Sequence, residues 1–204
     1  MATPAPMRIT AGFTQDMNFQ PLGIVGQPDP LFYSTFVDDF MNFEAADYTV
    51  TANTNGTAAA VAGDGGQIVL TTNSSTPLAT DIVSVQTPVA NTTLSATNKI
   101  AFGCRVKTSS ATNAAFNVGL IQTTTTPFTV TDGIYFGKAS GSAVITVYVV
   151  SGSTVQASAS LSGIVTLADN TFIDLAWTLN ARGDLLVFAG SNLYGQKAVS
   201  YTHL

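Results

Sequence analysis

Apolar and polar residues alternate with a period of two along much of this chain. In the stretch 99–107, the apolar positions are Ile100, Phe102, Cys104 and Val106. In the stretch 171–179, they are Ile173, Leu175, Trp177 and Leu179. Successive side chains of a β-strand point to opposite faces, so this period predicts strands with one face against a hydrophobic core. For the same reason, a core position for Trp177 is favoured over an exposed sugar-stacking role.

Short segments of this kind follow one another and are separated by turn residues. We expect strands over residues 32–40, 48–52, 58–62, 67–72, 81–87, 99–108, 115–123, 133–138, 143–150, 155–161, 171–179 and 185–189. Gly- and Asp-rich turns are expected at residues 63–66, 151–153 and 180–184, and a short helical turn at 42–47. Many short strands with such turns predict an all-β fold. We expect an antiparallel two-sheet jelly-roll sandwich over residues 31–204.

Residues 1–30 differ from the rest of the chain because they hold five of its eight prolines. Proline lacks a backbone donor and disfavours both helix and central strand, so this segment is expected to be an extended arm. A freely moving terminus is the alternative, but such tails usually lack apolar anchors. The anchors that we expect to order against a neighbouring subunit are Phe13, Met17, Phe19, Leu22, Ile24 and Val25.

The chain is poor in residues that catalyse reactions, with one His, one Cys and one Glu among 204 residues. Asp38 and Asp39 are adjacent and would point to opposite faces of a strand, so they do not form an acid–base pair. Glu44 and Asp47 could approach each other in a turn, but capping and turn formation explain them more simply. We therefore expect no enzymatic activity, no cofactor and a core role for Cys104.

The charges are few and acidic overall, with 9% charged residues and a net charge of −5. Nucleic-acid binding needs clustered basic residues, and Arg105 and Lys107 are the nearest approach to a cluster. No apolar run reaches the length of a membrane span. The start of the chain has no pattern of a secretory signal, so we expect assembly in a cytoplasm. A surface covered mainly by Thr, Ser and Asn suits packing against other proteins.

Five segments also resemble a known family: 36–40 (FVDDF), 66–72 (GQIVLTT), 99–106 (KIAFGCRV), 132–136 (DGIYF) and 171–177 (TFIDLAW). They are similar to strands of concanavalin-A-like (laminin-G-like) jelly rolls, in particular those of tailed-bacteriophage capsid cement or decoration proteins. The resemblance covers about residues 31–204. Enzymes of this superfamily carry a Glu-x-Asp-x-Glu strand, which a chain with one Glu lacks. Family members usually end with a further strand beside the first, which residues 196–204 do not show.

The resemblance implies a structural component of a virus particle. We expect a capsid cement or decoration protein on the capsid surface, assembled in the host cytoplasm, that stabilises contacts between capsomers. Its expected partners are the major capsid protein, further copies of itself in a homodimer or trimer, or both, with no nucleic acid and no membrane. The alternative is a carbohydrate-binding module or lectin-like receptor-binding domain, which would bind a glycan.

Overall fold

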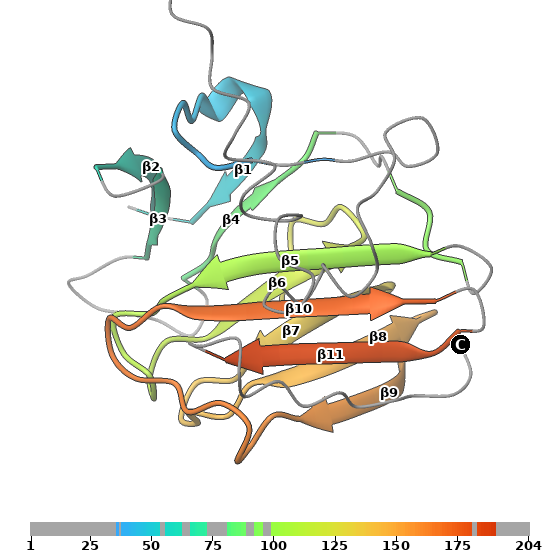
Figure 1. Cartoon of the computed structure of the whole chain (residues 1–204). Helices are drawn as coiled ribbons and strands as arrows, with labels where there is room; N and C mark the ends of the chain where they lie inside the picture. The colour runs from blue at the N-terminus through green and yellow to red at the C-terminus, as the bar shows by residue number, and fades with distance from the viewer. Residues whose placement is uncertain are drawn as a thin grey trace, which may run out of the picture. The chain divides into compact units, whose positions relative to one another are not determined.

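The computed structural model describes residues 36, 38–53, 56–62, 66–72, 81–88, 92–95, 99–180 and 183–190. These residues form antiparallel β-strands and one short 3-10 helix, which confirms the all-β prediction (Figure 1). The chain divides into two compact units. Of the described residues, 92–95, 99–122, 128–180 and 183–190 make the first unit, and 36–88, with the gaps given above, and 123–127 make the second. In the described part of the chain, no helix is long and apolar enough to cross a membrane.

The first unit contains two antiparallel sheets. One is a four-strand meander in the order β6 (Phe116–Ile121), β7 (Gly133–Lys138), β8 (Thr146–Ser151) and β9 (Thr154–Ser160). The other has the order β11 (Leu185–Gly190), β10 (Ile173–Leu179) and β5 (Ile100–Val106). The chain therefore leaves the three-strand sheet after β5, builds the meander, and returns to pair β10 with β5. The jelly-roll form of the sandwich stays a prediction.

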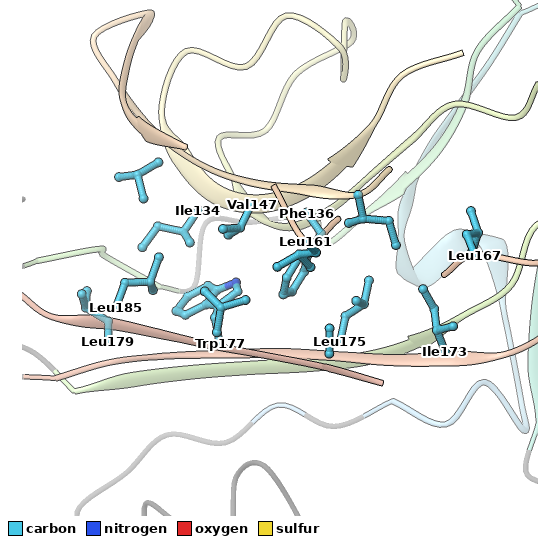
Figure 2. Close-up of a cluster of buried hydrophobic side chains, with 14 of the residues drawn as sticks. Ile134, Phe136, Val147, Leu161, Leu167, Ile173, Leu175, Trp177, Leu179 and Leu185 are labelled. Atoms are coloured by element: carbon cyan, nitrogen blue, oxygen red, sulfur yellow. The ribbon is translucent and has the colours of Figure 1, made fainter. Parts of the chain in front are cut away.

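A single hydrophobic core lies between these two sheets (Figure 2). Ile134, Phe136 and Val147 reach it from the meander, and Leu175 and Trp177 reach it from β10. The apolar positions of β5 and β6 pack against this core while keeping part of their surface exposed. The period of two in the sequence therefore predicted the buried face of the strands correctly.

A tight turn connects β8 to β9, because its two residues adopt backbone conformations with positive φ. Gly152 and Ser153 join β8 to β9, with φ values of 55° and 65°. Two consecutive left-handed residues match the twist of a two-residue hairpin. The Asp132 carboxylate accepts a hydrogen bond from the Gly152 N–H at 2.9 Å and so fixes this turn against the start of β7. The turn expected at residues 151–153 is confirmed.

The second unit contains two two-strand sheets. They are β1 (Thr49–Ala52) with β4 (Val83–Gln86), and β2 (Thr57–Val61) with β3 (Gln67–Thr71). The 3-10 helix spans Ala45–Asp47, where a short helical turn was expected. Half-buried Phe40, Phe43 and Tyr48 form an aromatic cluster, with the rings of Phe43 and Tyr48 stacked at 5.3 Å. Every buried hydrophobic side chain among the described residues belongs to the first unit.

One strand prediction is wrong. Residues 32–40 were expected to form a strand, but the described residues Phe36 and Asp38–Phe40 are not in a strand. The Asp38 carboxylate accepts a hydrogen bond from the Phe40 N–H at 2.7 Å, and Asp39 does the same for Met41 at 3.1 Å. Such bonds to the backbone two residues ahead favour a turn, and Phe40 has a φ of 53°.

The N-terminal arm and its anchors, from Phe13 to Val25, lie outside the described residues. The predicted boundary between an arm and a domain near residue 31 therefore stays a prediction. His203 and the Gly63–Asp64–Gly65 part of the expected turn at residues 63–66 also lie outside the described residues.

Candidate binding surfaces

The acidic residues considered for catalysis lie at exposed or partly exposed positions of the second unit. Asp38 and Asp39 form the turns described above. Glu44 precedes the 3-10 helix and Asp47 is its last residue. The Glu44 carbonyl accepts a hydrogen bond from the Asp47 N–H at 2.9 Å. Both side chains are exposed. Across the residues that the structure describes, no group of three or more His, Cys, Asp or Glu side chains could hold a metal ion.

Cys104 lies on the core-facing side of β5, where it is partly buried and packs against the hydrophobic cluster. Burial, and to a lesser extent the Asp174 carboxylate, raise the pKa of the Cys104 thiol from 9.0 to about 12. A thiol that is protonated at neutral pH is a poor nucleophile and a poor metal ligand. The structure therefore supports the core role expected for Cys104.

We expect Cys104 to make the fold sensitive to alkali. A pKa of about 12 in the folded state, above the ordinary value of 9.0, gives stability that is fully present below pH 9 and lost as pH rises toward 12. The loss is up to about 1.4 kcal/mol per pH unit in this window. Urea unfolding of the wild type and Cys104→Ala under reducing conditions, from pH 7 to 10.5, measures it. Parallel curves for the two proteins above pH 9 would contradict the assignment.

Among the strands of the second unit, the β2–β3 hairpin carries the exposed large hydrophobic side chains. Val61 and Val69 are 40% and 37% exposed and lie on the same face of the hairpin, because Val61 pairs with Gln67. Leu70, on the other face, is 46% exposed. Neither strand contains a charged residue. Charged side chains normally protect strand edges from pairing with other chains, and an isolated two-strand hairpin is marginally stable in water.

The second unit also includes residues from a loop between β6 and β7. The Gln86 side chain binds the backbone of Thr124 at both ends: its amide nitrogen donates to the Thr124 carbonyl, and its amide oxygen accepts from the Thr124 N–H at 2.9 Å. This reciprocal pair holds Thr123–Pro127 to the end of β4. The second unit thus has fixed polar contacts, although its described residues include no buried hydrophobic side chain.

A pair of stacked tyrosines lies on the outer face of the meander, opposite the core. Tyr135 and Tyr148 are partners across β7 and β8, with ring centroids 5.2 Å apart and ring planes at 24°. Gly137 leaves room for both rings, since a Cβ there would lie 2.9 Å from the Tyr148 ring and 3.2 Å from the Tyr135 ring. Ser158 on β9 lies opposite Tyr148 and is exposed. Burial, with a smaller effect of Tyr148, raises the pKa of Tyr135, so its hydroxyl stays protonated at neutral pH.

Residue type alone did not reveal this tyrosine pair in the sequence. The strand parity could have found it, because Ile134 and Phe136 fill the core and the residue between them must face outward. The one Trp, by contrast, is completely buried, as its strand pattern predicted.

A small basic cluster surrounds Phe172 just before β10. The Arg105 guanidinium lies 5.1 Å and the Lys107 ammonium 4.5 Å from the centre of the Phe172 ring, which are distances of cation–π contacts. Arg105 also lies 3.6 Å from the Asp174 carboxylate, and both side chains are well exposed. Both cations therefore have partners on their own surface. Comparison with protein-family models, with curated proteins and with solved structures gives no match to this chain.

Proposed function

We propose that this chain is a non-enzymatic structural protein of a virus particle, a capsid cement or decoration protein that stabilises contacts between capsomers. The observation that carries the proposal is the uncharged, exposed β2–β3 hairpin in a unit whose described residues bury no hydrophobic side chain. Burial of apolar surface and pairing of open strand edges against a neighbouring subunit would stabilise such an element.

In this proposal the two sheets of the first unit are part of a jelly-roll sandwich that provides a rigid support. The partners are the major capsid protein, other copies of the chain in a dimer or trimer, or both. The particle surface is the proposed location, after assembly in the host cytoplasm. Only 9% of the residues are charged, which is far below the usual share. This scarcity of charge agrees with a protein whose surface is packed against other proteins.

The decisive experiment replaces Val61 and Val69 together by lysine. Two charges on one exposed face should leave the fold intact and weaken binding to a neighbouring subunit by about a hundredfold, the effect of about 2–3 kcal/mol at an interface centre. Co-sedimentation with capsids that lack this protein, and light scattering after gel filtration for self-association, measure the binding.

Val155→Lys is the matched control, since Val155 is also an exposed strand valine, at 53%, but lies on β9 of the first unit. The control should bind as the wild type does. Unchanged binding of the double variant to capsids and to itself would refute the hairpin as the contact surface.

The tyrosine pair favours a second candidate, a carbohydrate-binding module. Stacked aromatic rings beside hydroxyl groups suit the apolar faces and the hydroxyls of a sugar chain. Under this alternative, the protein binds soluble polysaccharides in calorimetry, and Tyr148→Ala loses that binding while Val61→Lys/Val69→Lys retains it. Binding to capsids without binding to any glycan on an array would instead favour the structural role.

A further inference from the structure

The described residues carry their exposed positive charges on one side of a single strand. Four lysine or arginine side chains are described, and the one on β7, Lys138, is buried. The other three are exposed: Lys99 directly before β5, Arg105 within it and Lys107 directly after it. The even-numbered residues of β5 pack against the core, so the odd-numbered ones, and with them the three cations, point outward. We call these three residues, together with Phe172, the basic face.

The basic face is ordered and open to solvent. The Arg105 guanidinium and the Lys107 ammonium both lie over the Phe172 ring, and these cation–π contacts fix two long side chains in place. Asp174, 3.6 Å from Arg105, offsets one of the three positive charges, yet the Arg105 side chain stays 67% exposed. β5 is the last strand of its sheet among the described residues. Binding an anionic partner here therefore costs little side-chain entropy.

The second unit carries negative charge only. Its described residues include five acidic side chains and no basic one, a net charge of −5 (0 − 5). The described residues of the first unit hold four basic and four acidic side chains, a net charge of 0 (4 − 4). Four of the five carboxylates of the second unit lie within residues 38–47, which we call the acidic segment. Each molecule therefore has one acidic and one basic surface.

The carboxylates of the acidic segment are spaced to meet the cations of the basic face. Glu44 and Asp47 are exposed, and the 3-10 hydrogen bond from the Asp47 N–H to the Glu44 carbonyl joins them. Residues three apart in a 3-10 helix lie on the same side, about 6 Å apart along the axis. Arg105 and Lys107 lie two residues apart on one side of an extended chain, which separates them by about 7 Å. Two ion pairs can therefore form at once.

Exposed apolar side chains accompany the carboxylates. Met41, within the acidic segment, and Phe36, two residues before it, are each 65% exposed. Exposed ion pairs alone stabilise a contact little, because water competes for both charges. Burial of Met41 and Phe36 against a neighbour would supply the hydrophobic stabilisation that the ion pairs lack.

We propose that the acidic segment of one molecule docks on the basic face of a second copy of this chain. Charge complementarity identifies the occupant: every copy carries two exposed carboxylates at the spacing of the two ordered cations. Ion pairing also sets the orientation, since a contact between two acidic segments would bring like charges together. The contact uses neither the β2–β3 hairpin nor the tyrosine pair, so it is independent of the proposed function.

Charge reversal in the full-length protein tests the proposal, with self-association measured by sedimentation over a series of protein concentrations. Arg105→Glu/Lys107→Glu and Glu44→Lys/Asp47→Lys should each weaken self-association by about a hundredfold, because like charges then meet at the contact. An equimolar mixture of the two variants should associate almost as tightly as the wild type, since each reversed surface finds its complement on the other variant. A wild type that is monomeric at every concentration, or a mixture that associates no better than its components, would overturn the proposal.

The control variant Val155→Glu/Ser158→Glu also adds negative charge to the first unit, at two exposed positions of β9. It should associate as the wild type does, and a loss equal to that of Arg105→Glu/Lys107→Glu would show that net charge, not the basic face, governs association. Raising the salt concentration should weaken the wild-type association, because salt screens attraction between exposed charges.

Carbodiimide crosslinking of the unchanged protein gives the answer even where a variant fails to fold. The reagent joins carboxylates directly to lysine amines, so a mixture of unlabelled and ¹⁵N-labelled protein should yield peptides that link Lys107 to Glu44 or Asp47. These peptides should combine one labelled and one unlabelled half, as a contact between two molecules requires. Crosslinks of Lys107 to these carboxylates only within one molecule, or none at all, would overturn the proposal.

Discussion

Replacing Trp177 by alanine is expected to lower the free energy of unfolding by about 3–5 kcal/mol, the usual cost of deleting a buried aromatic side chain. Trp177 is completely buried at the centre of the core, and its ring stacks on Phe102 at 5.8 Å. Figure 2 shows its ring between the two sheets. Equilibrium unfolding in urea, followed by circular dichroism, measures the loss.

Two further variants separate packing from polarity at this position. The Trp177 Nε1 is buried and has no hydrogen-bond partner, so Trp177→Phe removes an unpaired donor while keeping most of the apolar surface. We expect a loss of about 1–2 kcal/mol for phenylalanine, less than half that of alanine. Val155→Ala, at a position 53% exposed, should change stability by less than about 0.5 kcal/mol. Equal losses for alanine and phenylalanine at position 177 would contradict this account.

Replacing Lys138 by methionine is expected to cost about 2–4 kcal/mol, because it removes the hydrogen bonds that the Lys138 ammonium donates to backbone carbonyls. Lys138 is 2% exposed, and its ammonium donates hydrogen bonds to the carbonyls of Thr112, Ala114 and Ala139. The Thr112 carbonyl keeps a second donor, the Gly141 N–H, so two carbonyls bear most of the loss. Burial lowers the pKa of Lys138, and removing the charge offsets part of the cost.

The measurement is urea unfolding together with hydrogen exchange of the loop at residues 108–114. Exchange should quicken in this loop, since the Lys138 ammonium ties it to the end of β7. Exposed Lys99 supplies the control, and Lys99→Met should leave both stability and exchange unchanged. A Lys138→Met protein as stable as the wild type would show that the ammonium does not hold the loop.

Most strands could be predicted from the sequence because burial on one face imposes a period of two. The eleven strands of the described residues fall within two or three residues of predicted segments, and β7 has the predicted bounds. The prediction failed at Asp38 and Asp39, where carboxylates that bind the local backbone outweigh the apolar pattern of their neighbours. Local side-chain chemistry of this kind competes with strand formation without changing the hydrophobic pattern.

The binding surfaces could be predicted less well, because they depend on which face of a strand meets the core. The outward position of Tyr135 follows from the alternation of faces along β7, because its neighbours Ile134 and Phe136 point into the core. The burial of Phe188, which points away from the core on β11, also had a signal, since residues 185–189 (LLVFA) are all apolar. A continuous apolar run is typical of a strand buried on both faces. The exposure of the β2–β3 hairpin needed the structure, because its valines look like core residues in the sequence.

The pairing of β5 with β10 also sets an order for folding. Val106 pairs with Ile173, 67 residues later in the chain (173 − 106), whereas each meander strand pairs with the next one along. Contacts between distant residues form late, because a long loop must close first. The meander therefore forms its hydrogen bonds before the opposite sheet does. During synthesis, the side chains of Ile134, Phe136 and Val147 stay exposed to solvent until β10 has left the ribosome. Rapid dilution from denaturant at high protein concentration should accordingly produce aggregates that grow through this half-built core.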